Sequence, residues 1–212
     1  MKGEKGEKLG PSFYLGEDTL QIARETLGKL LVVPDADGRR VSGIIVEVEA
    51  YLGVSDKAAH SYGGRRTARN EVTYGPGGHA YVFFVYGMYH QLNFVLGPTG
   101  HPHVVLIRAV EPLEGIELMR QRRGNMKDKN LTSGPGKLCI ALDIDRSLNG
   151  ASLIGDKIWV EEHKVIRQDE IAIGKRIGID YAAEDAEKPF RFWVLGNDHV
   201  RRPRIADRVL PE

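Results

Sequence analysis

Apolar residues in this chain occur in short runs bounded by glycine, proline and aspartate. The stretch LVVPDADGRRVSGIIVEVEAYLG (31–53) predicts a strand, an Asp-Gly turn and a second strand. Three further runs predict strands: HVVLIRAV (103–110), DKIWVEE (156–162) and FRFWVLG (190–196). Strands outnumber helices and hairpins dominate, which favours a β-rich α+β domain over a regular βαβ array.

Three segments carry the pattern of a helix. EDTLQIARETLGKL (17–30) places apolar side chains at Leu20, Ile22, Ala23 and Leu27. EPLEGIELMRQRR (111–123) has a proline near its start, where a first helical turn tolerates it. SGPGKLCIALDI (133–144) offers Ser, Gly and Pro before a short apolar helix. These are the helices that we expect.

Length and composition exclude several classes of protein. The 212 residues suit one domain, and we expect a flexible polar tail over residues 1–14 and a single domain over residues 15–212. No apolar run reaches the roughly 18 residues of a membrane span, and MKGEKGEKLGPS lacks the apolar stretch of a signal peptide. The single cysteine excludes a disulfide framework and suits a reducing cytoplasm. The net charge of +1 means that any basic footprint must be local.

Acidic residues alternate with apolar ones in GIIVEVEAYLG. The strand period of two predicts one face with Val46, Val48 and Ala50 and another with Ile45, Glu47, Glu49 and Tyr51. Two carboxylates and a tyrosine thus share a face, each about 6–7 Å from the next. Such a strand is either half exposed with solvated glutamates or part of an acid/base site, since paired carboxylates suit glycosidic chemistry.

The segment that follows, DKAAHSYGGRRTARNEVTYGPGG, combines a histidine with a cluster of cations. His60 lies nine residues after Tyr51, and six glycines between residues 53 and 78 allow close approach of backbone to a ligand. Arg65, Arg66 and Arg69 follow His60. The alternatives are a structural role for His60 and a solvated loop for the arginines. The joint placement of the histidine and the arginines beside the acidic strand favours a functional site.

Taken in order, these blocks resemble a known family. VEAYLG, DKAAHSYGGRRTARN, YVFFVYGMYHQLNFV, VLIRAVEPLEG and SGPGKLCIAL together resemble the alkyladenine (3-methyladenine) DNA glycosylases, over residues 15–205. The resemblance implies a curved antiparallel sheet with peripheral helices and a protruding hairpin, similar to the C-terminal domain of formyltransferases. It also implies a monomeric, cytoplasmic repair enzyme (nucleoid-associated if bacterial) that acts on double-stranded DNA containing damaged purines, with no membrane, cofactor or metal.

The resemblance assigns the catalytic positions. The family's general base, the glutamate before Ala-Tyr, is Glu49 here, and it activates a water that attacks C1′ of the deoxyribose. A carboxylate suits this step because it takes the water's proton and stabilises an oxocarbenium-like transition state. Arg108 matches the arginine that helps to hold the water, and a backbone carbonyl used by the family falls at Ile177. With water as nucleophile, the product is an intact abasic site.

The resemblance also assigns the pocket for a base that has left the duplex. Tyr51 matches the aromatic on which the flipped base stacks, and His60 matches the residue on its opposite side, whose backbone N–H also contacts the base. Phe83 stands where the family usually has tyrosine, so stacking remains and the hydroxyl is lost. Aromatic walls favour an electron-poor or cationic purine. Asn93 matches the asparagine that excludes guanine by crowding its amino group.

The remaining matched residues would contact DNA. Tyr86, at the tip of the hairpin 81–94, matches the residue that enters the gap left by the flipped nucleotide. Met88 and Tyr89 would lie against neighbouring sugars and bases. Phosphate contacts are expected from Arg65, Arg66, Arg69, Lys137 and the start of the helix 135–142. The alternative is a hairpin whose aromatics pack into a core or a dimer contact.

The hairpin admits two registers. A two-residue turn at 87–88 sets Phe83 opposite Leu92, and a three-residue loop at 87–89 sets it opposite Asn93. Only the second register places Phe83 and Asn93 on one face of the hairpin, because a slip of one residue moves side chains across the sheet. We therefore expect the three-residue loop.

Two other function classes remain open at this point. An RNA- or tRNA-binding module would use the aromatics and arginines for stacking and backbone contacts, but carboxylates repel phosphates. A carbohydrate hydrolase would use Glu47 and Glu49 as its catalytic pair, and the arginine-flanked aromatic hairpin disfavours it.

Overall fold

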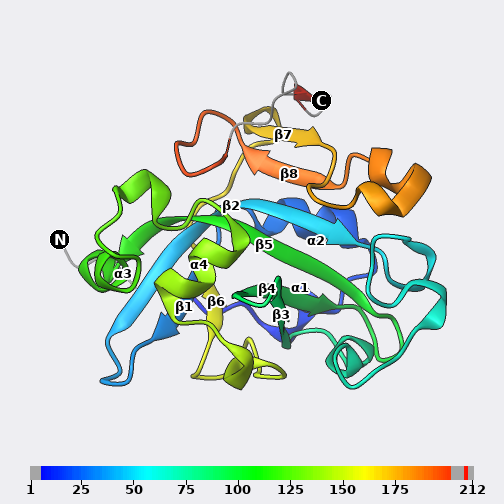
Figure 1. Cartoon of the computed structure of the whole chain (residues 1–212), viewed down its shortest axis with the longest axis horizontal. Coiled ribbons are helices and arrows are strands. Elements are labelled where there is room, and N and C mark those ends of the chain that lie inside the picture. Colours follow the sequence, from blue (N-terminus) through cyan, green and yellow to red (C-terminus); the bar gives the residue numbers. More distant parts are fainter. Residues whose placement is uncertain (1–5, 202–207, 210–212) are drawn as a thin grey trace.

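Two long neighbouring strands, β2 (Arg40–Tyr51) and β5 (His103–Glu114), form the centre of a curved antiparallel sheet (Figure 1). The computed structural model describes residues 6–201 and 208–209. The other strands are β1 (Leu30–Pro34), β3 (Ala80–Val85), β4 (Tyr89–Leu96), β6 (Trp159–Glu161), β7 (Ile171–Gly174), β8 (Arg191–Val194) and β9 (Arg208–Val209). Their order is β3-β4-β5-β2-β8-β7-β9, and β1 pairs with β2 and β6. The expected β-rich α+β single domain is confirmed; its likeness to the formyltransferase domain stays a prediction.

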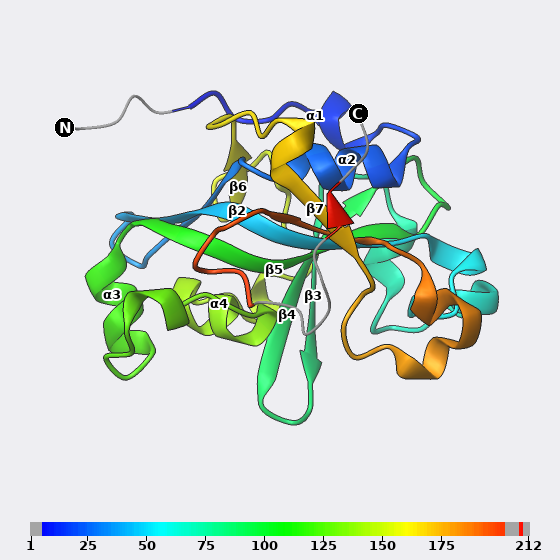
Figure 2. The same cartoon turned by 90° about the horizontal axis from the view of Figure 1, so that it is seen from above.

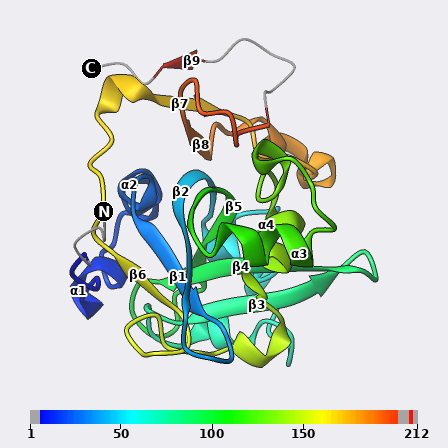
Figure 3. The ribbon, with the colours of Figure 1, turned by 90° about the vertical axis from the view of Figure 1, so that its left-hand side faces the viewer.

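Short helices cover one face of the sheet. Within residues 6–201 the α-helices are α1 (Pro11–Tyr14), α2 (Thr19–Thr26), α3 (Ile116–Arg122) and α4 (Pro135–Leu142). Tyr14, Ile22 and Leu138, from α1, α2 and α4, join Val48 and Ile107 in the main buried core. Figure 3 shows the sheet curving from the hairpin strands below to β7 and β8 above. No helix in the described part of the chain has the length and apolar character needed to cross a membrane.

The first predicted helix is present but shorter than expected. Asp18 accepts hydrogen bonds from the backbone N–H groups of Leu20 and Gln21, which starts α2. The helix ends at Thr26, and Gly28 follows with a φ of 82°, a conformation that residues with a Cβ rarely adopt. The chain then enters β1, so the last turn of the helix predicted over 17–30 is wrong.

The second predicted helix is wrong in its first half. Pro112 lies in β5 opposite Gly43, beside a shift in the pairing between β2 and β5. An irregular site of this kind tolerates a residue without an N–H group. Helix α3 begins only after Gly115, whose φ of 73° redirects the chain. The third predicted helix corresponds to α4, and the predicted strands are all present.

Strand β2 departs from simple alternation near its middle. Its pairing with β5 shifts between Ile45 and Glu47 and again between Glu47 and Val48, which marks a bulge. Ile45 therefore packs in the main core with Val48, while Val46 packs in a smaller cluster beside β8. The expectation that Ile45 points with Glu47, and Val46 with Val48, is wrong because the bulge resets the period.

The aromatic hairpin projects from the body of the molecule, between α4 and the 175–188 segment (Figure 2). A three-residue loop at 86–88 joins β3 to β4, and Val85 lies opposite Tyr89. Tyr86 has a φ of 54° and is 76% exposed at the tip. The predicted loop length is confirmed, but its predicted position at 87–89 is wrong by one residue.

The observed pairing of the hairpin sets another residue opposite Phe83 than expected, but it keeps Phe83 and Asn93 on one face. Phe83 lies opposite Gln91, and Asn93 lies opposite Tyr81, so the expected pairing of Phe83 with Asn93 is wrong. The partner of Phe83 differs from the expected one by two residues, which is one strand period, so every side chain stays on the face expected for it. Phe83 and Asn93 therefore still share a face.

The packed structure begins before residue 15. Leu9 donates its backbone N–H to Val160 of β6, and its side chain is buried. Tyr14 is fully buried in the main core. The flexible tail expected over residues 1–14 is therefore wrong from Leu9 onward, because pairing with an edge strand and an aromatic anchor hold this segment. Residues 1–5 lie outside the described residues.

Candidate active site

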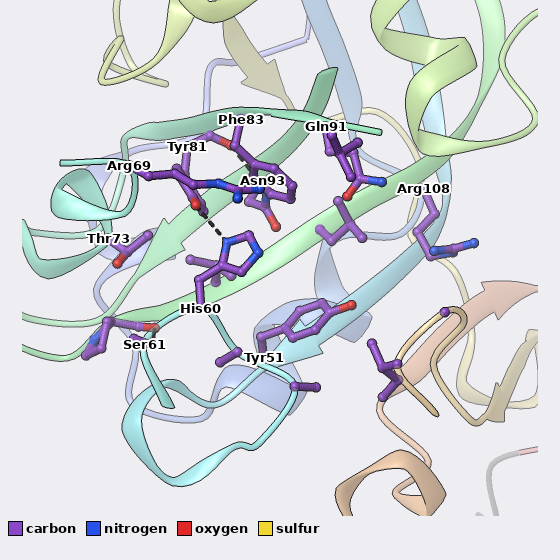
Figure 4. Close-up of a pocket in the computed structure, with 18 of the residues that line it drawn as sticks. Tyr51, His60, Ser61, Arg69, Thr73, Tyr81, Phe83, Gln91, Asn93 and Arg108 are labelled. Carbon is purple, nitrogen blue, oxygen red and sulfur yellow. Dashed lines mark hydrogen bonds between the residues drawn. The ribbon is translucent and has the colours of Figure 1, made fainter. Parts of the chain in front are cut away.

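A cavity of about 250 Å³ opens on the face of the sheet opposite the main core (Figure 4). Strands β2 to β5 form its floor, and the segments 58–61 and 177–181 form further walls. Six of the predicted catalytic and base-binding residues line it: Tyr51, His60, Phe83, Asn93, Arg108 and Ile177. Glu49 is fully buried and reaches the cavity through its contacts with three of the lining residues.

The sheet register gathers these residues from distant parts of the chain into two rows. The first row crosses β3, β4, β5 and β2 through Tyr81, Asn93, Leu106 and Glu49. The second row, two residues further along each strand, consists of Phe83, Gln91, Arg108 and Glu47. Side chains two residues apart on a strand share a face, so both rows face the same side of the sheet.

Three donors converge on the carboxylate of Glu49. The Tyr51 hydroxyl donates to Oε2 at 2.8 Å, and the amide N–H of Ile177 donates to Oε1 at 2.8 Å. Nη1 of Arg108 lies 3.2 Å from the same Oε1. Burial and the neighbouring Glu49 raise the pKa of Tyr51 well above its usual value, so its hydroxyl keeps its proton and donates. The carboxylate is thereby held in one orientation.

Glu47 is paired with two arginines. Its Oε1 accepts from Nε of Arg108 at 2.8 Å and from Nε of Arg191 at 2.7 Å, and all three side chains are buried. Burial acts to lower the pKa of Arg108, but Glu49 and Glu47 outweigh it and raise the pKa. Two carboxylates thus balance two guanidinium groups. Glu47 fixes Arg108 and is not among the lining residues of the cavity.

Tyr51 is supported from behind by a buried cation. Cζ of Arg176 lies 4.7 Å from the centroid of the Tyr51 ring, and Arg176 is paired with Asp56 and with the carbonyl of Ala50. The arginine occupies one face of the ring. The other face of Tyr51 is the one available to the cavity.

His60 contacts Phe83 and Tyr81 in the wall of the cavity. Its Nδ1 shares a hydrogen bond of 2.8 Å with the Tyr81 hydroxyl, and its ring centroid lies 4.7 Å from that of Phe83. The side chain reaches solvent at the mouth, but burial by the cavity walls, with Arg69 and Arg65 nearby, lowers the pKa of His60 to about 4. Burial raises the pKa of Tyr81 to about 12, with Arg69 opposing it. Both rings are therefore neutral at pH 7.

Asn93 is buried in the floor of the cavity. Its Nδ2 donates to the carbonyl of Tyr81 at 3.2 Å, which fixes the carboxamide. A rigid polar group of this kind can exclude a base by shape.

Of the predicted DNA-contacting residues, Tyr86 and Arg69 line the cavity. Tyr86 and Met88 are largely exposed, and Tyr89 packs on Gly136 of α4, where an added Cβ would lie 2.9 Å from the ring. Lys137 follows Gly136 in α4. Burial, with Arg201 and Arg123 adding to it, lowers the pKa of Lys137.

The three arginines of the 65–69 segment differ in their surroundings. Arg65 is exposed and forms no ion pair with any described residue. Arg66 pairs with Glu71 through two hydrogen bonds. Arg69 lies over the ring of Phe83, with Cζ 4.9 Å from its centroid, and lines the cavity. Neither Arg65 nor Arg69 thus forms an ion pair with a described residue, and Arg69 in addition belongs to the pocket wall.

Sequence reasoning missed several lining residues. Tyr81 and Gln91 lie on the same face of the hairpin as Phe83, and the strand period applied to residues 81–94 would have found them. Tyr181 comes from a distant 3-10 segment and carries no sequence signal. Over residues 6–201 and 208–209, no three His, Cys, Asp or Glu side chains are arranged to hold a metal ion.

The chain is similar to known proteins over most of its length. The family model described as methylpurine-DNA glycosylase (MPG) matches residues 12–198. A protein of Clostridium acetobutylicum named "Putative 3-methyladenine DNA glycosylase" is 50% identical over 201 residues, which cover 91% of this chain and 97% of that protein. Proteins with the same name from Bacillus cereus strain G9842 and Bacillus thuringiensis strain Al Hakam are 52% and 51% identical, over 91% of this chain and 98% of theirs. This chain belongs to the methylpurine-DNA glycosylase family.

Proposed function

We propose that this protein is a DNA glycosylase that flips alkylated or deaminated purines out of duplex DNA and hydrolyses the bond between base and sugar. The observation that carries the proposal is the position of Glu49, a buried carboxylate with three oriented donors at the edge of an aromatic cavity. Membership of the family and relatives named as 3-methyladenine DNA glycosylases support the same substrate class.

The proposed reaction is a displacement by water. Glu49 takes a proton from a water molecule whose oxygen forms a bond to C1′, while the bond from C1′ to the purine nitrogen breaks and its electron pair leaves with the base. Arg108 and the carbonyl of Ile177 are the groups that we assign to holding this water. An alkylated purine that is already cationic leaves as a neutral base, whereas a neutral purine such as hypoxanthine needs a further proton.

The walls suit an electron-poor base. Tyr51 offers one ring face, and His60 and Phe83 lie opposite it. With a pKa of about 4, His60 is neutral at pH 7 and does not repel a cationic purine. Aromatic faces attract positive charge through their quadrupole. We therefore propose 3-methyladenine, 7-methylguanine, hypoxanthine and ethenoadenine as substrates.

The two rival functions fit the site less well. A carbohydrate hydrolase needs a second carboxyl group beside the substrate, but Glu47 is occupied by Arg108 and Arg191. A simple RNA-binding module has no use for a buried carboxylate beside its base pocket. The hairpin, with Tyr86 exposed at its tip, suits an aromatic wedge in a duplex.

The test is incubation with a labelled duplex that contains one hypoxanthine, followed by alkali. Strand cleavage only after alkali is expected, because a glycosylase of this kind leaves an abasic site. No lysine lines the cavity among the described residues, so borohydride should trap no covalent adduct. Absence of alkali-labile sites with every proposed base would contradict the proposal. A monomer that needs no cofactor and works in the cytoplasm remains our prediction.

A further inference from the structure

One polar side chain of the cavity has no assigned task. Gln91, in β4, lines the cavity and is half-buried, and its carboxamide forms no hydrogen bond with any described residue. The other carboxamide of the floor, Asn93, is held by the carbonyl of Tyr81. A carboxamide that faces a binding cavity with its donors and acceptor free is able to read a ligand.

The sheet register places Gln91 near the reacting end of the cavity. Gln91 lies opposite Phe83 of β3. On its other side β4 pairs with β5 as far as Asn93 and Leu106, and Gln91 and Arg108 each lie two residues beyond this last pair. Figure 4 shows the Gln91 carboxamide between the Phe83 ring and the Arg108 side chain. Arg108 in turn contacts Glu49.

The chemistry of the reaction limits which atom of the base lies there. Because Glu49 activates the water that attacks C1′, the bond to the purine nitrogen N9 must lie at the Glu49–Arg108 end of the cavity. In the order of the ring atoms, N3–C4–N9–C8, the positions N3 and C8 flank N9 and its neighbour C4. N3 accepts a hydrogen bond, whereas C8 carries a C–H group. A donor at this end therefore meets N3.

We infer that Gln91 is a specificity-determining residue that donates a hydrogen bond from Nε2 to N3 of the flipped purine; this inference rests on the proposed function. Hypoxanthine, ethenoadenine and 7-methylguanine have a free N3 and benefit from this contact. In 3-methyladenine the methyl group occupies N3, so the contact cannot form. As the bond to N9 breaks, electron density moves into the ring and strengthens a hydrogen bond at N3, which raises the rate for purines with a free N3.

The experiment uses DNA methylated at random, which carries 7-methylguanine and 3-methyladenine in one sample. Initial rates of release of the two bases are measured by chromatography for the wild type, Gln91→Met and Gln91→Glu. Methionine keeps the length of the side chain and glutamate keeps its shape, but neither donates. The ratio of 7-methylguanine to 3-methyladenine release is expected to fall by about three- to tenfold, the effect of one neutral hydrogen bond. Because both bases come from one reaction, the ratio does not depend on the concentration of active enzyme.

Two controls sharpen the result. Gln21→Met makes the same chemical change in α2, on the far face of the sheet, and should leave the ratio unchanged. In a duplex with the 3-deaza analogue of hypoxanthine, which lacks the N3 acceptor, Gln91→Met should not slow release further.

The outcomes separate this inference from the proposed function. An unchanged ratio, or an equal loss in the release rates of both bases, would show that Gln91 does not read N3. Either result would overturn the inference, while the proposed glycosylase activity would stand. If the wild type releases neither base, the proposed function fails and the inference fails with it.

Discussion

The amide N–H of Ile177 donates to Oε1 of Glu49 at 2.8 Å, across 128 residues of sequence. The loop that carries Ile177 therefore orients the proposed general base. Ile177 donates its N–H to Glu49, and the carbonyl of the same residue is the one that we assign to the attacking water. Orientation of the base and of the water thus depend on one short segment outside the strand that carries Glu49.

Glu49→Gln should abolish base release and leave binding of damaged DNA nearly intact. Glutamine keeps the shape of the side chain and can still accept from Ile177, but it cannot take a proton from water. A loss of about 10²–10⁴-fold is expected for a positioned general base. Single-turnover release of hypoxanthine measures the rate, and a gel shift with the same duplex measures binding.

Glu47→Gln is the matched control, because the same change is made two residues away. It should cost far less in single-turnover rate per folded molecule. It leaves Arg108 and Arg191 with an unbalanced buried charge, so the free energy of unfolding should fall by about 3–5 kcal/mol. Equal losses of rate in the two variants would contradict the assignment of Glu49 as the base.

His60 should make the folded protein less stable in acid. Its pKa is about 4 in the folded protein and about 6.5 in an unfolded chain, so the unfolded state binds more protons between these values. Stability due to His60 is complete above pH 6.5 and is lost as the pH falls toward 4. Denaturant unfolding at pH 7 and pH 4.5 should show a smaller loss in His60→Gln than in the wild type. The same loss in both proteins would show that His60 does not titrate in this window.

Arg65 should contribute more to DNA binding than its neighbour Arg66. Arg65 is free of ion pairs among the described residues, whereas the charge of Arg66 is already offset by Glu71. Arg65→Ala should flatten the dependence of log K on log salt by about 0.9 for one lost phosphate contact, and Arg66→Ala by less. Titrations of undamaged duplex at several salt concentrations provide the slopes. A larger change with Arg66→Ala would reverse this ranking.

Tyr86→Ser should weaken capture of a damaged base from duplex DNA. The exposed ring at the hairpin tip is the proposed wedge, and unstacking one step costs about a few kcal/mol, which the wedge helps to offset. Release of the same base from single-stranded DNA needs no wedge and should change much less. Comparison of the two substrates under single-turnover conditions tests this. A variant with unchanged activity on duplex DNA would remove the assigned role.

The sequence by itself determined the elements whose residues interact locally. A period of two put Glu49 and Tyr51 on one face of β2, and the hydrogen bond between them confirms this. Helix α4 followed from local signals in the same way. The three-residue loop of the hairpin was instead inferred from the requirement that Phe83 and Asn93 share a face.

The tertiary structure alone decided what depends on pairing between distant segments. The bulge at Ile45–Glu47 exists because β2 pairs with β5, and β5 accommodates Pro112 because the pairing with β2 is irregular there. Glu47 meets Arg191 across 144 residues because β8 pairs with β2. Such contacts are set by strand order and register, which arise from burial of the whole core and leave no trace in the local pattern of residues.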